Sequence, residues 1–293
     1  MTASDSHSPL LSAAELAQRL DEPDWIVVDC RFDLMDKAAG RTAWESGHIP
    51  GAYYADLDRD LAAPVTANGA GGRHPLPRRE AVLALFRSWG MHAHSTVVAY
   101  DDVGGAIAAR LWWLLRWFGH QRVAVLDGGI QAWQAGGHVL SQDRPAERAG
   151  GFDGAPGAMP VTDAGIGVAV ANGERVLLDA RDANRFAGRA EPLDARAGHV
   201  PGAINAPLQD NLGADKCFRS PAELQAYYRA IVGDQPMEMV ACMCGSGVTA
   251  CHTLLALEIA GLPGAALYSG SWSDWISDPA RPIVTPMATA DDD

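Results

Sequence analysis

Short apolar runs of strand length alternate along the chain with segments of helical periodicity. The runs are nearly continuous and rich in β-branched residues, which is typical of strands buried on both faces of a parallel sheet. We expect strands at 25–28, 96–100, 123–126, 176–178, 239–243 and 265–268. We expect helices at 13–20, 79–89, 106–118, 221–232 and 248–260. Ser12 and Ser220, each followed three residues later by Glu, predict helix-capping boxes. The alternation predicts an α/β fold.

The chain also repeats itself at domain-sized spacing. WIVVDCR…SGHIPGA within residues 24–52 matches RVLLDAR…AGHVPGA within 175–203, and LDGGIQAW at 126–133 is echoed by YSGSWSDW at 268–275. A repeat of this length predicts two copies of one domain rather than a solenoid. A stretch rich in Gly, Pro and Ala follows the first copy. We therefore expect a first domain at 1–145, a linker at 146–160 and a second domain at 161–293.

Composition and charge narrow the function classes. Of 293 residues, 23 are Lys or Arg and 36 are Asp or Glu, so the net charge is −13. An acidic surface disfavours nucleic acid and anionic membranes as partners. The apolar runs fall far short of the roughly 20 residues that span a bilayer. The first residues carry no basic, apolar secretory pattern, so we expect a cytoplasmic protein.

Five cysteines, an odd number without a regular framework, indicate free thiols in a reducing compartment. Three of them and His252 follow a C-x-C-x6-C-H pattern, which lacks the paired spacing of a zinc site. We expect no metal and no cofactor. We also expect Cys242 and Cys251 to be buried, with Cys242 on the opposite face of its strand from Cys244.

The segment CGSGVT, residues 244–249, carries the chemistry. A buried strand ends just before it and a helix follows. Two glycines let the backbone curl so that several N–H groups converge, and the positive end of the helix adds to this anion cradle. A cysteine at the mouth of such a cradle is stabilised as the thiolate. Cys244 is therefore the candidate nucleophile.

GHIPGA and GHVPGA in the two halves, CGSGVTACH, and GSWSDW near the end together resemble the two-domain rhodanese-type sulfurtransferases, most closely the 3-mercaptopyruvate sulfurtransferases. The resemblance implies two tandem rhodanese-like domains, each a mainly parallel sheet flanked by helices. It implies that Cys244 takes sulfur from a small-molecule donor as a persulfide. The sulfur would then pass to cyanide, a small thiol or reduced thioredoxin.

The resemblance assigns further site residues. Asp101 stands where the first domain would carry its cysteine, which makes that half catalytically silent. Asp58 and His74 of the first domain fall in the places of a relay with Ser246. This chain either moves protons near the donor or clamps the two domains together.

The residues that would hold the donor match the family's pattern only in part. Gly245, Gly247, Val248 and Thr249 complete the loop around it. The family binds the carboxylate of mercaptopyruvate with two arginines. Arg185 matches the first by its R-F-x-G context. The family's E-P-x-P-R stretch has no direct counterpart here, so Arg189 and Arg196 are both candidates for the second.

Three other functions compete. A phosphatase would need C-x5-R, but position 250 holds Ala250. A non-catalytic rhodanese-like binding module would have no need of the intact loop. A thiosulfate sulfurtransferase would carry Arg-Lys after the cysteine, to attract a dianion, whereas this chain has the neutral Gly245 and Ser246. We expect mercaptopyruvate as the donor, with thiosulfate as the main alternative.

Overall fold

The computed structural model describes residues 8–285, which form two five-stranded sheets in which every strand pair is parallel. The first has the order β1-β5-β4-β2-β3 and the second β6-β10-β9-β7-β8, so each strand has a counterpart five places later. The strands are β1 (Leu10–Leu11), β2 (Trp25–Asp29), β3 (Tyr53–Tyr54), β4 (Thr96–Tyr100), β5 (Val123–Leu126), β6 (Val161–Thr162), β7 (Val176–Asp179), β8 (Ile204–Asn205), β9 (Val240–Met243) and β10 (Ala266–Tyr268). The identical order confirms the duplicated α/β fold.

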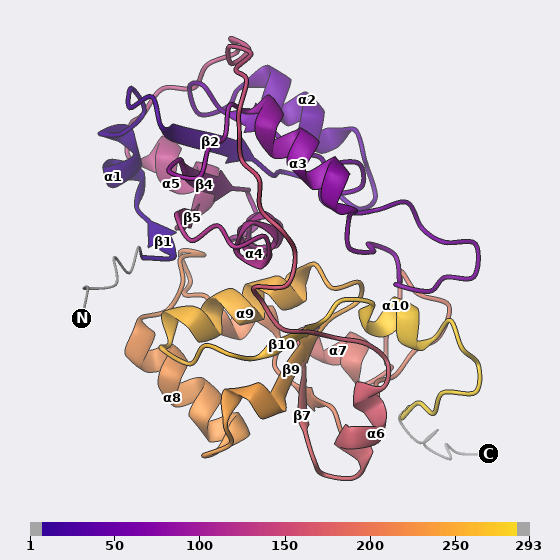
Figure 1. The fold of residues 1–293 in the computed structure, drawn as a ribbon. Coiled ribbons are helices and arrows are strands. Elements are labelled where there is room, and N and C mark those ends of the chain that lie inside the picture. Colours follow the sequence, from indigo (N-terminus) through magenta and orange to yellow (C-terminus); the bar gives the residue numbers. More distant parts are fainter. Residues whose placement is uncertain (1–7, 286–293) are drawn as a thin grey trace, which may run out of the picture.

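Helices flank both sheets (Figure 1). They are α1 (Ala13–Ala17), α2 (Ala39–Ser46), α3 (Arg79–Ser88), α4 (Ala108–Trp117), α5 (Gly129–Ala135), α6 (Ile166–Ala171), α7 (Ala183–Phe186), α8 (Pro221–Val232), α9 (Thr249–Ile259) and α10 (Ser271–Trp275), with two short 3-10 turns at Leu208–Asn211 and Met237–Met239. The capping boxes at Ser12 and Ser220 are confirmed: each hydroxyl accepts the N–H of the third following residue. Within the described residues, every helix is too short or too polar to cross a membrane.

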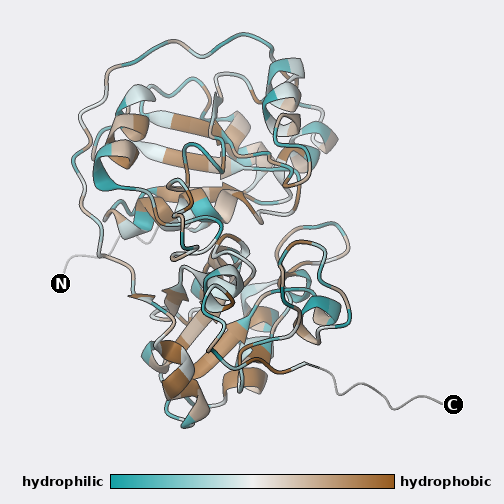
Figure 2. Ribbon diagram, turned by 90° about the vertical axis from the view of Figure 1, so that its right-hand side faces the viewer, coloured by the Kyte–Doolittle hydropathy of each residue, from teal (hydrophilic) through white to brown (hydrophobic). Residues whose placement is uncertain are grey.

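The six central strands follow the predicted runs, but the four edge strands were missed. Each edge strand has only two residues, which is too short for any periodicity. The brown strands at the centre of each half in Figure 2 show where the apolar runs lie. The hydrophobic core is therefore built around the predicted central strands.

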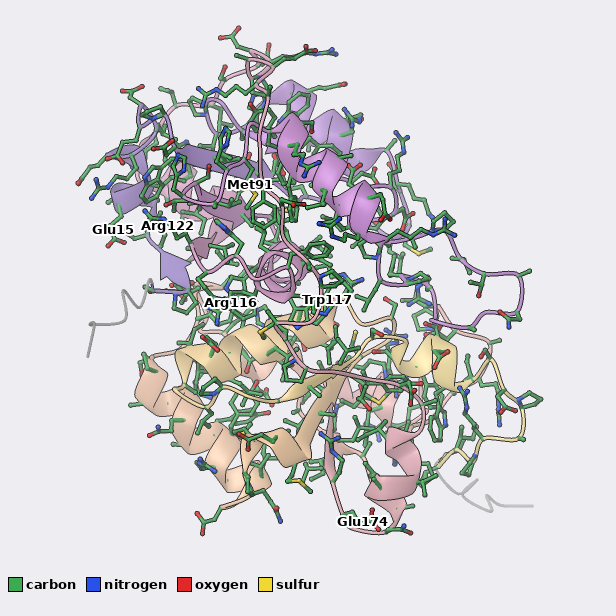
Figure 3. The ribbon with its side chains drawn as sticks, viewed as in Figure 1. Glu15, Met91, Arg116, Trp117, Arg122 and Glu174 are labelled. Atoms are coloured by element: carbon green, nitrogen blue, oxygen red, sulfur yellow. The ribbon has the colours of Figure 1, made fainter. Side chains whose placement is uncertain are left out.

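The two domains share a core at the contact between α4 and α9. Eight consecutive residues of α4, from Ala108 to Leu115, are buried, because sheet residues cover one side and α9 the other. One hydrophobic cluster runs continuously through both domains and includes Trp112 and Trp113, which are fully buried. At its edge, Arg116 makes an ion pair across the boundary with Glu258, 3.1 Å apart. Figure 3 labels Arg116 on this boundary.

The stretch 141–160 contains neither helix nor strand, yet it is held against the first domain. The backbones of Ser141 and His48 exchange two hydrogen bonds, and Arg148 forms a bridge with Trp89. Phe152 is buried and packs on Phe86 with ring centroids 6.0 Å apart. This segment is therefore anchored along much of its length before the chain enters the second domain.

Candidate active site

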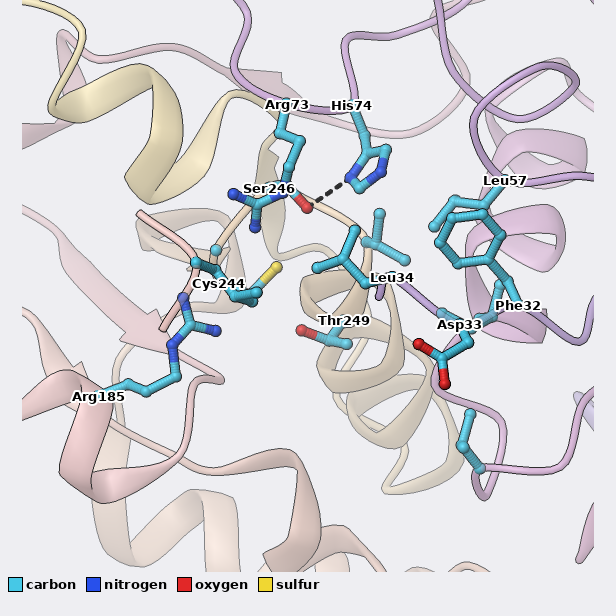
Figure 4. Close-up of a pocket in the computed structure, with 15 residues that line it drawn as sticks. Phe32, Asp33, Leu34, Leu57, Arg73, His74, Arg185, Cys244, Ser246 and Thr249 are labelled. Atoms are coloured by element: carbon cyan, nitrogen blue, oxygen red, sulfur yellow. Dashed lines mark hydrogen bonds between the residues drawn. The ribbon is translucent and has the colours of Figure 1, made fainter. Parts of the chain in front are cut away.

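Cys244 directly follows β9 and lies in a cavity of about 360 Å³ between the domains (Figure 4). Ligands of parallel α/β sheets bind beyond the carboxyl ends of the strands, and Cys244 occupies that position. The first domain contributes Phe32, Asp33, Leu34, Leu57, Arg73, His74, Val103 and Ile107 to the lining, and the second contributes Arg185, Leu193, Cys244, Gly245, Ser246, Val248 and Thr249. Neither domain alone encloses this cavity.

The loop after β9 is fixed by hydrogen bonds to α10. The Cys244 N–H donates to Ser271 Oγ at 3.1 Å, and the Cys244 carbonyl accepts the Trp272 N–H at 3.0 Å. Gly247 has φ +78°, and a Cβ there would lie 2.1 Å from the Ser269 carbonyl oxygen, so only glycine fits. The Gly247 N–H donates to Cys244 Sγ at 3.1 Å. The loop therefore presents the sulfur to the cavity while pairing it with a backbone donor.

The equivalent turn of the first domain holds a carboxylate. Asp101 directly follows β4, the counterpart of β9. Its side chain accepts four N–H groups, from Val103, Gly105, Ile107 and Ala108, at 2.8 to 2.9 Å. The first domain thus fills its own anion cradle. In the second domain, the N–H groups of Gly245, Ser246 and Val248 have no acceptor within residues 8–285.

The residues Asp58, His74 and Ser246 form a continuous hydrogen-bonded chain across the domain boundary. His74 Nδ1 lies 2.7 Å from Ser246 Oγ, and His74 Nε2 lies 3.0 Å from Asp58 Oδ1. Lys37 Nζ lies 2.5 Å from the other Asp58 oxygen. The structure therefore brings the three predicted relay residues together and adds Lys37, which the sequence did not indicate.

The pKa values of Asp58 and His74 indicate where the protons lie in the Asp58–His74–Ser246 hydrogen-bonded chain. Burial opposes ionisation of Asp58, but its contacts with Lys37 and His74 outweigh burial and lower the pKa of Asp58. Burial lowers the pKa of His74 to about 4, more than Asp58 raises it, so the ring is neutral at pH 7. Because Nε2 faces the Asp58 carboxylate, the neutral ring carries its proton on Nε2. Nδ1 is then an acceptor, and the Ser246 hydroxyl donates to it.

Arg110 donates hydrogen bonds to backbone carbonyls of both domains at the site. It is fully buried in α4, and its guanidinium donates to the carbonyls of Leu61, His74 and Gly247 at 3.2 to 3.3 Å. No carboxylate lies within ion-pair distance of Arg110 in the described part of the chain. One buried cation therefore fixes the backbone of the histidine and of the cysteine loop together.

A group of arginines and carboxylates lies beside the loop. Arg185 is bonded to Glu191 at 2.7 Å and to Asp194 at 3.1 Å. Asp194 also binds Arg73 of the first domain, with 2.6 Å between Oδ1 and Nη1. Arg185 and Arg73 both line the cavity. Sequence reasoning missed Arg73, and its only signal was adjacency to His74.

The two predicted alternatives for the second carboxylate-binding arginine are not at the cavity. Arg189 is exposed and bonded to the side chain of Asn184. Arg196 does not line the cavity either, and its carbonyl accepts from Trp272 Nε1. Arg185 and Leu193 of the same segment line the cavity, whereas Arg189 and Arg196 do not.

The position predicted for Cys242 was wrong. Cys242 and Cys244 belong to the same hydrophobic cluster, whereas Ala241 and Met243 belong to the cluster on the other side of the sheet. Strand side chains alternate with period two, so residues two apart share a face. Among the described residues, no group of three or more His, Cys, Asp or Glu side chains could hold a metal ion.

Comparisons with known proteins agree with this architecture. A rhodanese-like domain model matches residues 12–136 and 169–278. A probable 3-mercaptopyruvate sulfurtransferase of Pseudomonas aeruginosa is 47% identical over 96% of this chain and 99% of its own. A putative thiosulfate sulfurtransferase of Mycobacterium tuberculosis is 36% identical over 94% and 96%. The solved 3-mercaptopyruvate sulfurtransferase of Leishmania major has a TM-score of 0.82 at 30% identity, covering 96% of this chain and 77% of its own. The chain therefore belongs to the rhodanese-like family and carries two such domains in tandem.

Proposed function

We propose that this protein is a sulfurtransferase that takes sulfur from 3-mercaptopyruvate as a persulfide on Cys244 and passes it to a thiophilic acceptor. The observation that carries the proposal is the surroundings of Cys244: a cavity with a paired backbone donor at the sulfur and guanidinium groups beside the loop. The names of the relatives in Pseudomonas and Leishmania support the same donor.

The other cysteines support Cys244 as the reacting thiol. Burial raises the pKa of Cys242 and raises that of Cys251 to about 12. Burial and nearby carboxylates raise the pKa of Cys217 to about 11 and place that of Cys30 well above its usual range. All four are thiols at pH 7, and only Cys244 lines the cavity. Nucleophilic chemistry requires the thiolate, so these four are unsuited to it.

The proposed transfer balances as follows. The Cys244 thiolate attacks the sulfur of the donor, and the carbon–sulfur bond breaks with its electron pair moving to carbon. The carbon then gains a proton, so the products are pyruvate and the Cys244 persulfide. A second thiolate or cyanide attacks the outer sulfur and releases the Cys244 thiolate. The uncommitted N–H groups of Gly245, Ser246 and Val248 suit the negative charge of a persulfide.

We propose that Asp58, His74 and Ser246 move the proton that this step requires. The Ser246 hydroxyl donates to His74, so its lone pairs are available to the donor thiol in the cavity. His74 has a lowered pKa and therefore returns a proton readily rather than retaining it. The His74–Ser246 hydrogen bond also joins the two domains.

Thiosulfate is the second candidate donor, because a relative of M. tuberculosis carries that name and because the loop is less isolated from cations than its sequence suggests. A Cβ on Gly245 would lie 3.2 Å from Arg73 Nη2 and 3.6 Å from both terminal nitrogens of Arg185. These guanidinium groups are, however, offset by Glu191 and Asp194. The group as a whole carries little excess positive charge for a dianion, which favours mercaptopyruvate.

Steady-state kinetics with both donors and cyanide as the acceptor test the proposal. We expect a higher kcat/KM with mercaptopyruvate, and a gain of one sulfur atom on Cys244 in the mass spectrum after brief exposure to it. A higher kcat/KM with thiosulfate would establish the second candidate. A chain that gains no sulfur from either donor would leave the binding-module function instead.

The acceptor in the cell is a further part of the proposal. We propose a small thiol or reduced thioredoxin, working in the cytoplasm. The support is that all five cysteines are free, as a reducing compartment would keep them. A thioredoxin-coupled assay with mercaptopyruvate, in which pyruvate release depends on thioredoxin concentration, tests this choice.

A further inference from the structure

We propose that Lys37, an exposed residue of the first domain, is a positioning residue for the Asp58–His74–Ser246 chain. Its ammonium group holds one oxygen of Asp58, which keeps the other oxygen on His74 Nε2 and offsets the charge that would otherwise draw a proton onto the ring. The inference rests on the proposed function and extends the hydrogen-bonded chain to a residue at the protein surface.

The first support is the way in which the Asp58 carboxylate divides its contacts. Oδ2 lies 2.5 Å from Lys37 Nζ, and Oδ1 lies 3.0 Å from His74 Nε2. Within residues 8–285, these are the only side chains that bond to the Asp58 carboxylate, and Lys37 pairs with no other acidic side chain there. Each partner therefore holds one oxygen, and loss of Lys37 would free the carboxylate to rotate away from the histidine.

The second support is the turn that carries Lys37. Asp33 Oδ1 accepts the N–H of Asp36 at 3.2 Å, and Asp36 Oδ1 accepts the N–H of Ala38 at 3.1 Å. These bonds fix the backbone on either side of Lys37, although its side chain is 68% exposed. The same turn reaches the site, because residues 32–34 line the cavity (Figure 4). The position of the Lys37 side chain is therefore tied to the wall of the cavity.

The third support is that the backbone of Asp58 is held separately from its carboxylate. Asp56 Oδ1 accepts the N–H groups of Asp58 at 3.0 Å and of Arg59 at 3.1 Å. The Asp58 side chain is 25% exposed, so water can compete with His74 for its oxygens. A lysine ammonium is a compact charge on a flexible stem, and it can hold such an oxygen from the surface. Lys37 therefore fixes the carboxylate, which the backbone bonds leave free to turn.

The charges around His74 explain why this contact affects the proton. Burial opposes protonation of the ring, as do Arg110 and Arg73, whereas Asp58 favours it. Lys37 offsets part of the Asp58 charge, so burial prevails and Nδ1 remains an acceptor for the serine hydroxyl. Without Lys37, Asp58 would act on the ring at full charge and the pKa of His74 would rise. A protonated ring donates from both nitrogens and cannot take the serine proton.

The test compares Lys37→Met with wild type and with Lys216→Met. The chain has only these two lysines, and Lys216 is also exposed and does not line the cavity of Cys244. For Lys37→Met we expect kcat with mercaptopyruvate to fall roughly 3- to 10-fold at pH 7, because the relay is less well aligned. KM should stay within about twofold of wild type, since Lys37 does not line the cavity either. Lys216→Met should match wild type in both constants.

The His74 ring is measured separately from turnover, by NMR titration of histidine-labelled protein in which His74→Gln identifies the His74 signal. We expect the midpoint of His74, and with it the acid limb of the kcat profile, to lie about 0.5–1 pH unit higher in Lys37→Met than in wild type. Lys37→Arg, which keeps the charge, should restore the midpoint and most of kcat. Cys244 and Asp33, the titratable groups that share the cavity with His74, are present in every variant. Melting temperatures should stay within about 2 °C of wild type, because the substituted side chain is exposed.

The outcomes separate the inference from the function on which it rests. A wild-type protein that gains no sulfur from mercaptopyruvate would overturn the proposed function, while the NMR titration would still decide whether Lys37 governs the His74 ring. An active wild type in which Lys37→Met titrates and turns over like Lys216→Met would overturn the inference alone. A fall in kcat at every pH with an unchanged His74 midpoint would also overturn it, because Lys37 would then support the turn and not the charge of Asp58.

Discussion

His252 predicts a specific sensitivity to acid. The ring is fully buried between the domains: Nε2 donates to the Gly104 carbonyl at 3.0 Å, and Nδ1 lies 3.2 Å from the Asn211 amide nitrogen. The Tyr228 hydroxyl donates to Asn211 Oδ1 at 2.6 Å, which turns the amide NH2 toward the histidine. Nδ1 must therefore accept, and the ring is neutral. A proton on Nδ1 would set two donors against each other inside the core.

The sign and size follow from the pKa. Burial lowers the pKa of His252 to about 4 from an ordinary value of 6.5. Between these values the unfolded chain binds a proton that the folded chain does not, so stability is present above pH 6.5 and is lost as the pH falls toward 4. Between pH 7 and pH 5 this one group removes about 2 kcal/mol of stability.

Urea unfolding at pH 7 and pH 5 measures the effect. We expect His252→Gln, which does not titrate, to lose about 2 kcal/mol less than wild type between the two pH values. His94→Gln, a change at an exposed histidine, is the matched control and should follow wild type. Comparing variants removes the contribution of carboxylates, which is common to all three proteins. If His252→Gln lost as much stability as wild type over this interval, the neutral buried ring would be refuted.

Three further predictions concern the site and its support. Cys244→Ser should abolish persulfide formation and turnover, whereas Cys242→Ser should keep most activity, as mass spectrometry and kinetics would show. Arg110→Met should lower the free energy of unfolding by roughly 2–4 kcal/mol and reduce kcat, because three backbone carbonyls at the site each lose a charged donor. Residues 161–293 expressed alone should be nearly inactive and poorly soluble, since they expose the face of α9 that packs on α4 and lack His74.

Each of these has a result that would contradict it. Equal loss in the two cysteine variants would remove the assignment of a single nucleophile. An Arg110→Met protein with wild-type stability would show that those carbonyls find other donors. Full activity in the isolated second half would mean that the relay from the first domain takes no part in turnover.

Sequence periodicity located the central strands because their residues are buried on both sides and leave a continuous apolar run. It could not locate β1, β3, β6 or β8, whose two residues pair only because a neighbouring strand is already in place. Trp112 and Trp113 lie in the helix expected at 106–118. Periodicity shows that a helix is buried but not which domain covers it, and α9 covers this one.

For the site, motifs brought together the cysteine loop and the Asp58–His74–Ser246 chain, because each lies in a recognisable local context. Arg73 carries no such context. Its place at the cavity depends on contacts with α10, about 200 residues later in the chain, and on an ion pair with Asp194. Arg189 and Arg196 do not line the cavity, because closeness in sequence to Arg185 does not fix the direction of a side chain.

The four N–H groups gathered on Asp101 have a consequence for the stability of the duplicated chain. Hydrogen bonds to an ionised group contribute about 1.5–3 kcal/mol each, so the four bonds to the Asp101 carboxylate together stabilise this turn by several kcal/mol. A cysteine placed at that position would lose this stability, because its single sulfur cannot accept all four N–H groups. Any substitution of Asp101 therefore costs the first domain stability, whatever chemistry the new side chain could perform. In the second half the N–H groups of Gly245, Ser246 and Val248 have no acceptor within residues 8–285, so this loop gives up stability to keep those groups available to a ligand.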